Sequence, residues 1–289
     1  MTEVPASSGV SASIEVRGLI EDLAGEHDAL DAVVSVLDDS GWATPTPSPG
    51  WSVADQISHL AFFDATAVTA IEDPDRFAAE TAELMERAFA PGGSLDAVTL
   101  DRYRDLTPVE LLTAWRDGRS GLLAAAGTLG DGDRVPWYGP SMGARSFLTA
   151  RLMETWAHGQ DVVDAVGAER PASRRLVHVA QLGVITRAWS YRNRGLSAPE
   201  VDIAVELQGP DGTVHRWGPD GAEHAVTGGL EDFCLVVTQR RHPDDTGLVA
   251  TDGPAAEWLR LAQAFAGGAT DGPRSKNSQI GGGSADTPM

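Results

Sequence analysis

Cysteine and lysine are almost absent from this chain of 289 residues, and it has no long apolar run. Cys234 is the only cysteine, so an internal disulfide is impossible and one chain cannot build a metal site from several thiolates. No apolar stretch approaches the roughly 20 residues of a membrane span, and the first residues lack the pattern of a signal peptide. The sequence therefore predicts a cytoplasmic protein whose metal ligands, if any, are nitrogen and oxygen atoms.

Positive charge is also scarce. The chain has 42 acidic against 22 basic residues and a formal net charge of -20. Such a surface repels phosphate backbones and anionic lipid heads, so we expect neither nucleic acid nor a membrane as partner. Lys276 is the sole lysine, and the wealth of arginine, alanine, glycine and valine is typical of a GC-rich actinobacterial genome. The sequence favours a small-molecule substrate and indicates no oligomeric state.

Helical periodicity dominates the first part of the chain. Apolar residues recur at three- and four-residue steps over residues 13–37, as one face of a helix requires. After a proline-rich turn, Ser52 followed three positions later by Asp55 is typical of a capped helix start. Similar patterns predict helices over residues 52–72, 74–89, 108–129, 146–166 and 173–191.

The pattern changes after residue 200. Residues 201–207 alternate apolar and polar side chains, which predicts a half-buried strand. A turn over residues 209–212 leads into a return strand over residues 214–217, so a hairpin is expected. Two further helices are predicted, over residues 230–238 and 254–265.

These patterns predict a helical bundle followed by a small mixed α+β domain. From Gly267 onward glycine, serine, aspartate and proline dominate, which favours disorder. The predicted parts are a flexible N-terminus (1–11), a helical bundle (12–167), a connecting helix (168–198), an α+β domain (199–267) and a disordered tail (268–289).

Glu154 and His158 are the first candidates for chemistry. Four residues apart on a helix, they lie roughly 40° apart on one face and can reach one ion. A third ligand has to come from another helix, and His59, beside apolar neighbours on a predicted helix, is the best candidate. Imidazole and carboxylate suit zinc, and such a site also accepts nickel, iron or manganese. Taken alone, this spacing is weak evidence for a metal, because acidic residues and histidines four apart are more often a surface pair, or a polar pair in a helical core.

Two segments add a resemblance. Residues 49–60, PGWSVADQISHL, are similar to the GW-[ST]-V-x-D-x-x-x-HL signature of the DinB-like superfamily, in particular of the amino-terminal domain of mycothiol-dependent maleylpyruvate isomerases. Residues 154–162, ETWAHGQDV, match the E-x-W-x-H-x-x-D-[VIL] pattern of the same family. The resemblance spans residues 12–167 and implies an up-down four-helix bundle. It also implies that His59, Glu154 and His158 bind zinc, with water or a thiolate at the open position.

The resemblance further implies mycothiol as a co-substrate. Parts of residues 232–267 are similar to a subgroup of actinobacterial metal-binding proteins and to a domain named for wyosine base formation. The family's isomerases also use an arginine of their second domain. No arginine here is matched to it, so isomerase activity does not follow from the resemblance.

Several neighbours of the predicted ligands have two interpretations. Arg151 falls on the same helical stripe as Glu154 and His158, where it either grips a substrate carboxylate or forms an ion pair with a carboxylate. Asp161 and Asp55 are placed either to orient a liganding imidazole or to carry surface charge, and for Asp55 we favour a role at the helix start.

The remaining candidates are predicted to be structural. Core packing is expected of Trp51 and Trp156. His27 is expected on a polar helix face, and Cys234 as a small buried apolar residue. The other histidines, His178, His215, His224 and His242, lack paired ligand spacing.

Three hypotheses for function follow. The first is a metal-dependent isomerase or transferase that activates a low-molecular-weight thiol, mycothiol, toward a small electrophilic metabolite. The second keeps the metal and activates water or a carbonyl without any thiol. The third is a metal-binding module without turnover. Dependence on the thiol separates the first two, and a substrate-sized pocket beside an open coordination position counts against the third.

Overall fold

The computed structural model describes residues 8–276, with side chains from Val16 onward. The predicted flexible residues 1–7 and tail residues 277–289 lie outside the described residues. The chain divides into two compact units, Met1–Arg170 and Pro171–Met289. The first unit is a helical bundle and the second a small mixed sheet with helices, which confirms the predicted fold class.

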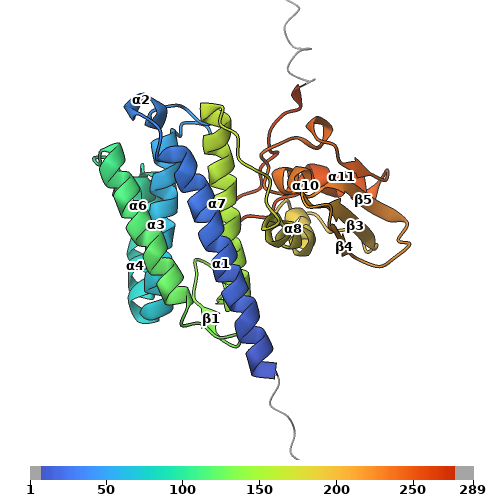
Figure 1. Ribbon diagram of the computed structural model, residues 1–289, viewed down its shortest axis with the longest axis horizontal. Coiled ribbons are helices and arrows are strands. Elements are labelled where there is room, and N and C mark those ends of the chain that lie inside the picture. The colour runs from blue at the N-terminus through green and yellow to red at the C-terminus, as the bar shows by residue number, and fades with distance from the viewer. Residues whose placement is uncertain (1–7, 277–289) are drawn as a thin grey trace, which may run out of the picture. The chain divides into compact units, whose positions relative to one another are not determined.

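Four long helices form the first unit: α1 (Ser8–Val34), α3 (Val53–Glu72), α6 (Pro108–Ala126) and α7 (Ala144–Val166). They lie lengthwise beside one another in Figure 1, where α3 packs on α6 and α7, and α1 packs on α7. The shorter elements are α2 (Asp39–Trp42), α4 (Pro74–Phe89), α5 (Leu95–Leu100) and a hairpin of β1 (Arg134–Val135) and β2 (Met142–Gly143).

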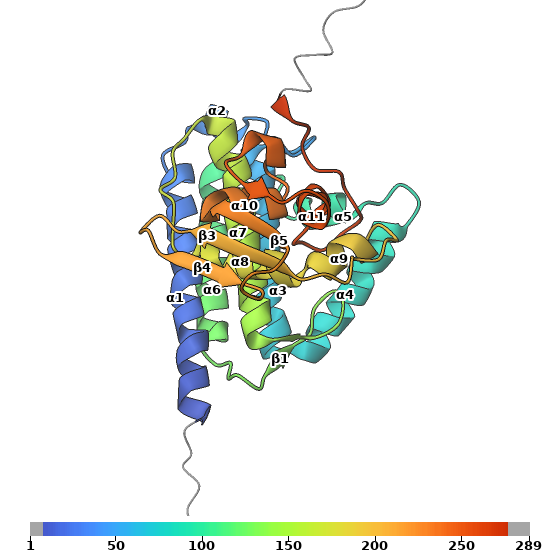
Figure 2. The ribbon, with the colours of Figure 1, turned by 90° about the vertical axis from the view of Figure 1, so that its right-hand side faces the viewer.

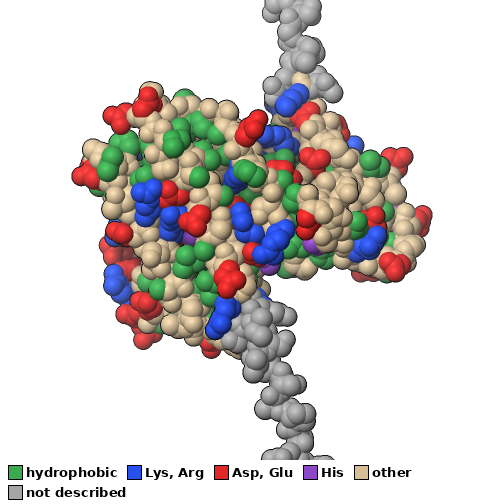
Figure 3. Space-filling view, viewed as in Figure 1, with side chains coloured by type: hydrophobic (Ala, Val, Ile, Leu, Met, Phe, Trp, Pro, Cys, Tyr) green, Lys and Arg blue, Asp and Glu red, His purple; other side chains and the backbone are tan. Residues whose placement is uncertain are grey.

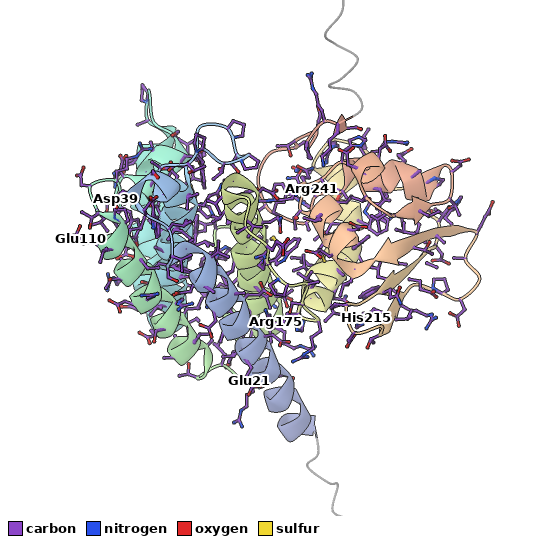
Figure 4. All side chains as sticks on the ribbon, turned by 45° about the horizontal axis from the view of Figure 1, so that its top comes forward. Glu21, Asp39, Glu110, Arg175, His215 and Arg241 are labelled. Atoms are coloured by element: carbon purple, nitrogen blue, oxygen red, sulfur yellow. The ribbon has the colours of Figure 1, made fainter. Side chains whose placement is uncertain are left out.

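Local capping sets where the bundle helices begin. The Ser52 hydroxyl accepts from the backbone N–H of Asp55, and the Asp55 carboxylate accepts from the Ser52 backbone at 2.9 Å, so the predicted start of α3 is confirmed. Thr107 and Glu110 form the same reciprocal pair at the start of α6, where Figure 4 labels Glu110. α7 ends at Gly167, whose left-handed φ of 64° suits a residue without a Cβ.

The bundle core is built from the apolar stripes of these helices. Leu30 and Val34 of α1, Ile57 and Leu60 of α3 and Trp115 of α6 are fully buried in one cluster. α3 is the central helix, because its neighbours cover it on several sides and nine of its side chains are buried. Any polar residue on the covered faces of α3 therefore has to find its partner inside the bundle.

The second unit holds a four-stranded sheet in the order β4-β3-β5-β6. Its strands are β3 (Ile203–Gln208), β4 (Val214–Trp217), β5 (His224–Gly229) and β6 (Val249–Ala250). Figure 2 shows β3, β4 and β5 side by side. The β3–β4 hairpin confirms the expected strand and return strand, with Val205 opposite Trp217. The parallel pairing of β3 with β5 was not predicted from the sequence.

Helices complete the second unit: α8 (Leu176–Ile185), α9 (Arg187–Arg192), α10 (Leu230–Val237), α11 (Pro254–Leu261) and a 3-10 turn at Pro243–Asp245. The helix predicted over residues 173–191 is thus two helices that meet at Thr186. α8 packs on α10 so closely that a Cβ on Gly183 would lie 2.8 Å from a Val237 methyl carbon. Residues 268–276 of the predicted tail are hydrogen-bonded to this unit, for example from the Lys276 backbone N–H to Asp245 at 3.0 Å.

The surface agrees with the charge of the sequence. Among residues 8–276 no helix is long and apolar enough to cross a membrane. On the face of the first unit that Figure 3 shows, acidic side chains are widely spread and basic ones lie among them. The acidic excess on this face is therefore not gathered into one patch.

Candidate metal centre

His59 of α3 and Glu154 and His158 of α7 come together inside the first unit, as the sequence predicts. Nε2 of His59 lies 3.7 Å from Glu154 Oε2, and Nε2 of His158 lies 3.2 Å from the same oxygen. One ligand atom from each residue can be chosen so that all lie within 4.8 Å of one another. Ligand atoms about 2.0–2.2 Å from one ion lie roughly 3–4 Å apart, so this triad could bind a metal ion.

The side chains of the triad are partly exposed to solvent. The side chains of His59, Glu154 and His158 are 17%, 25% and 13% exposed. Three protein ligands with solvent access on one side are typical of sites that keep a coordination position for water or substrate. The exposure is therefore what a reactive metal centre requires.

The charges of the triad also suit a cation. Burial, together with the nearby His158, lowers the pKa of His59 to about 4. Burial raises the pKa of Glu154, but the neighbouring imidazoles of His158 and His59 outweigh this effect and hold that pKa well below its usual value. At neutral pH the site thus presents a neutral imidazole at His59 and a carboxylate at Glu154, which are the forms that bind metal.

Gln56, one turn before His59 on α3, determines which nitrogen of His158 faces the centre. Its amide nitrogen lies 2.9 Å from the Thr46 hydroxyl and 3.5 Å from Asp161 Oδ2, which only accept from it. Its amide oxygen therefore points at Nδ1 of His158, at 2.5 Å. A carbonyl oxygen accepts a hydrogen bond, so Nδ1 carries a hydrogen, and in the neutral imidazole Nε2 is the lone-pair atom.

This tautomer makes the close contact with Glu154 informative. The lone pair on Nε2 of His158 and the Glu154 carboxylate lie 3.2 Å apart, and two such acceptors repel unless a proton or a cation lies between them. A divalent ion shared with His59 relieves this repulsion. The donor set, its spacing and its tautomer all fit a metal ion.

Asp161 and Asp55, predicted either to orient an imidazole or to carry charge, have different positions. Asp161 is buried and accepts from Ser48 at 3.1 Å and from Gln56, so it acts on His158 through the glutamine. Asp55 accepts from the backbone and hydroxyl of Ser52, which confirms the structural role at the helix start. Sequence analysis did not single out Gln56, although a polar residue on the apolar stripe of α3 is a signal of a buried partner.

Aromatic rings enclose the two imidazoles. Trp51 lies 5.3 Å from the His59 ring and stacks on His158 at 5.9 Å, so this half-buried residue packs on two predicted ligands and not, as expected, in the buried core. Phe63 contacts His59 on the other side, with ring centroids 4.6 Å apart. Phe63 also touches Tyr138, so an aromatic cluster extends away from the metal centre.

Arg151 forms a buried ion pair with Asp64. Its Nη2 donates to Asp64 Oδ1 at 2.8 Å, and the two side chains are 4% and 0% exposed. Of the two interpretations of Arg151, the structure shows an ion pair with a carboxylate other than Glu154. Substrate contact by Arg151 stays a prediction, and one edge of its guanidinium is already engaged.

His27 is not on a polar helix face, so that expectation was wrong. Its side chain is 1% exposed, and Nε2 lies 3.6 Å from Asp64 Oδ2. Its ring meets Trp115 edge-on at 6.1 Å. Burial lowers the pKa of His27 to about 4, so the ring is neutral at physiological pH. α1 turns this residue inward because a helix of the bundle presents one stripe to the core.

Other candidates lie apart from the triad. His215 is on β4 of the second unit, where Figure 4 labels it, and Cys234 is buried with its thiol 3.3 Å from the Leu176 carbonyl, as expected. Residues 139–143, GPSMG, fit the G-x-S-x-G pattern of serine hydrolases. Ser141, however, lies on an exposed hairpin, where Arg134 Nε donates to its hydroxyl at 2.9 Å, and not in the strand-turn-helix setting that this chemistry uses.

Comparison with known families finds one match within the first unit. A family model described as "Mycothiol maleylpyruvate isomerase N-terminal domain" matches residues 23–163, which include all three members of the triad. Two curated relatives are uncharacterized proteins from Mycobacterium tuberculosis, of strains CDC 1551 / Oshkosh and ATCC 25618 / H37Rv. Each is 46% identical over 249 residues, covering 86% of this chain and 95% of the relative.

Two solved structures share the fold. One is the crystal structure of the mycothiol-dependent maleylpyruvate isomerase, with a TM-score of 0.54, and the other is a histidine-to-alanine mutant of that enzyme, with a TM-score of 0.53. Each comparison covers 82% of this chain and 93% of the other, at 16% sequence identity. At that identity the similarity concerns the fold alone.

Proposed function

The chain belongs to the mycothiol maleylpyruvate isomerase N-terminal domain family, and we propose that it is an enzyme that uses a divalent metal ion, zinc above all, to activate a low-molecular-weight thiol. His59, Glu154 and His158 would hold the ion. The observation that carries the proposal is the contact between Nε2 of His158 and the Glu154 carboxylate at 3.2 Å, where a cation shared with His59 would replace the proton that otherwise has to lie between them.

A metal ion bound here would lower the pKa of a bound thiol or water and so supply a nucleophile near neutral pH. The chain need not provide that nucleophile itself, which agrees with a buried Cys234 in the second unit. The residues of this chain have other tasks. Gln56 holds the His158 tautomer, and Trp51 and Phe63 fix the planes of the two imidazoles.

The reaction class follows from a thiolate meeting a small electrophile. On an activated double bond, the thiolate sulfur forms a bond to one carbon, the former double bond rotates, and loss of the same thiolate restores it. The net result is isomerisation with no atom gained or lost. On an electrophile with a leaving group, the sulfur stays and the leaving group departs, which is S-transfer. Family membership supports mycothiol as the thiol and maleylpyruvate-like compounds as the first electrophiles to test.

The first experiment is metal analysis of the full chain purified without a histidine tag. We expect about one equivalent of divalent metal, and loss of it in Glu154→Ala and His158→Ala. Glu83→Ala and His215→Ala are matched controls, because these residues lie outside the triad, and they should keep the metal. Full metal content in the triad variants would refute the site.

A second experiment tests the thiol. Turnover of maleylpyruvate, or of a model electrophile, should require mycothiol, and mycothiol should perturb the visible spectrum of the cobalt-substituted protein. The partial exposure of the triad also admits water, which favours a thiol-independent reaction as the second candidate. If mycothiol changes neither the cobalt spectrum nor the rate, and the metal-loaded protein still turns over a substrate, the second candidate would be established. A metal-loaded protein without any turnover would leave a metal-binding module.

A further inference from the structure

A cavity in the first unit lies between α3, α4 and α5, and no residue of the triad lines it. Its volume is about 560 Å³, which falls within the range of small-molecule sites. The apolar part of its wall includes Phe62 of α3, Phe77 and Leu84 of α4, and Tyr138. Phe77 and Leu84 are buried, so the cavity has an apolar floor.

The rim of this cavity carries three arginines, which differ in their partners. Arg76 is bound to Glu80 at 2.8 Å. Arg87 makes no hydrogen bond or ion pair with any residue that the structure describes, and Arg102 only faces the Tyr103 ring at 5.8 Å. Acidic residues outnumber basic ones by 42 to 22 in this chain, so a shortage of carboxylates does not explain why Arg87 and Arg102 lack a carboxylate partner.

The carboxylates of the rim do not cancel this charge. Glu80 is taken by Arg76, and Asp101 lies 3.2 Å from Arg104. Among the acidic residues that line the cavity, this leaves only Glu83 without an arginine partner. Two lining arginines, Arg87 and Arg102, have no carboxylate partner among the described residues. The unpaired side chains of the rim thus carry one net positive charge.

A polar atom in the wall also lacks a partner. The hydroxyl of Thr81, which lines the cavity, is buried and makes no hydrogen bond to the described part of the chain. Because this oxygen is itself fully buried, it lies behind the cavity surface, and the polar groups within reach of a bound molecule are those of the exposed arginines.

We propose that this cavity is a second small-molecule site, which binds an organic carboxylate with an apolar body. The body packs on Phe62, Phe77 and Leu84, and the carboxylate is held by Arg87 and Arg102. Phe63 touches both His59 and Tyr138, so the wall of this site and the metal centre share one aromatic cluster. The assignment does not depend on the metal, because none of the lining residues is a proposed ligand.

Calorimetric titration of the metal-free full-length protein with decanoate tests the proposal. We expect saturable binding of one equivalent. Acetate, which has no apolar body, should not bind measurably, and the double variant Arg87→Gln/Arg102→Gln should bind decanoate about tenfold more weakly or worse, because hydrogen bonds to charged groups contribute that much. Both arginines are exposed, so the variant should fold.

Arg17→Gln is the matched control, because Arg17 is exposed on α1 and loses the same charge outside the cavity. It should keep the affinity of the unchanged protein. No saturable binding, full affinity in the double variant, or an equal loss in the control would each overturn the proposal. Since the titration uses metal-free protein, failure of the metal centre would not alter its outcome.

Discussion

Among the histidine–carboxylate pairs of the described helical bundle, His59–Glu154 and His27–Asp64 are separated by nearly the same distance, but only the first is suited to a metal. His59 and Glu154 are 3.7 Å apart, and His27 and Asp64 are 3.6 Å apart. The first pair is 17% and 25% exposed, and the second 1% and 0%. Residue types and distance alone therefore do not make a metal site.

What differs is the third group at each pair. Beside His59 and Glu154 stands His158, a further ligand with its lone pair turned inward. Beside His27 and Asp64 stands Arg151, a cation that already neutralises the carboxylate. The charge of a buried carboxylate next to a guanidinium is already compensated, whereas a carboxylate between two imidazoles has room for an added positive charge. Four variants test whether the two pairs differ in this way.

The largest effect should come from Asp64→Ala. The substitution leaves Arg151 buried without its partner, which destabilises a protein by about 3–5 kcal/mol. Glu154→Ala in metal-free protein should cost much less, because its carboxylate is 25% exposed. Urea unfolding of both variants measures the difference. A smaller loss for Asp64→Ala than for Glu154→Ala would contradict the comparison, and replacing Arg151 by Met as well should restore part of the stability.

The pH dependence of the free energy of unfolding should show that His27 is buried as a neutral ring. Its pKa falls from 6.5 to about 4 on folding because of burial, so the unfolded chain binds a proton in that window that the native protein does not. Stability should therefore rise with pH between about 4 and 6.5, by about 3 kcal/mol for this one group. His27→Gln should remove that part of the slope in urea titrations of metal-free protein. An unchanged slope would show that His27 is not buried as a neutral ring, and His215→Gln is the control.

Gln56→Leu tests the positioning of His158. Without the amide oxygen at Nδ1, the imidazole loses its preferred tautomer, and groups that orient metal ligands contribute about tenfold to a hundredfold in affinity. Competition with a chromophoric chelator measures the metal affinity. Gln181→Leu, in the second unit, should leave it unchanged. Equal affinity in Gln56→Leu would mean that the glutamine only fills space.

Asp55→Ala should have the smallest effect. The loss of a cap at the start of α3 costs about 1 kcal/mol. Metal content should not change, because the carboxylate serves the helix start and not the triad. Thermal unfolding together with metal analysis checks both statements. A loss of metal would mean that Asp55 supports the metal site and not only the helix start.

The sequence predicted the triad because two of its members share a helix and the third sits in a recognisable segment. It did not predict the partner of Arg151. Asp64 occupies the same buried stripe of α3 as Gln56 and Leu60, and a charged residue at such a position was a signal of an internal ion pair. Which residue of α7 would meet it depends on how the two helices are aligned, and no local pattern specifies that.

Sequence alone determined what depends on neighbours along the chain: the capped starts of α3 and α6, the glycine end of α7, the β3–β4 hairpin and the shared helix face of Glu154 and His158. Only the tertiary structure decided that His59 reaches that pair, that Arg151 meets Asp64 and that β3 lies parallel to β5. Local elements form through hydrogen bonds between nearby residues, whereas each of these other pairings needs parts of the chain that are well separated in sequence to pack in one alignment.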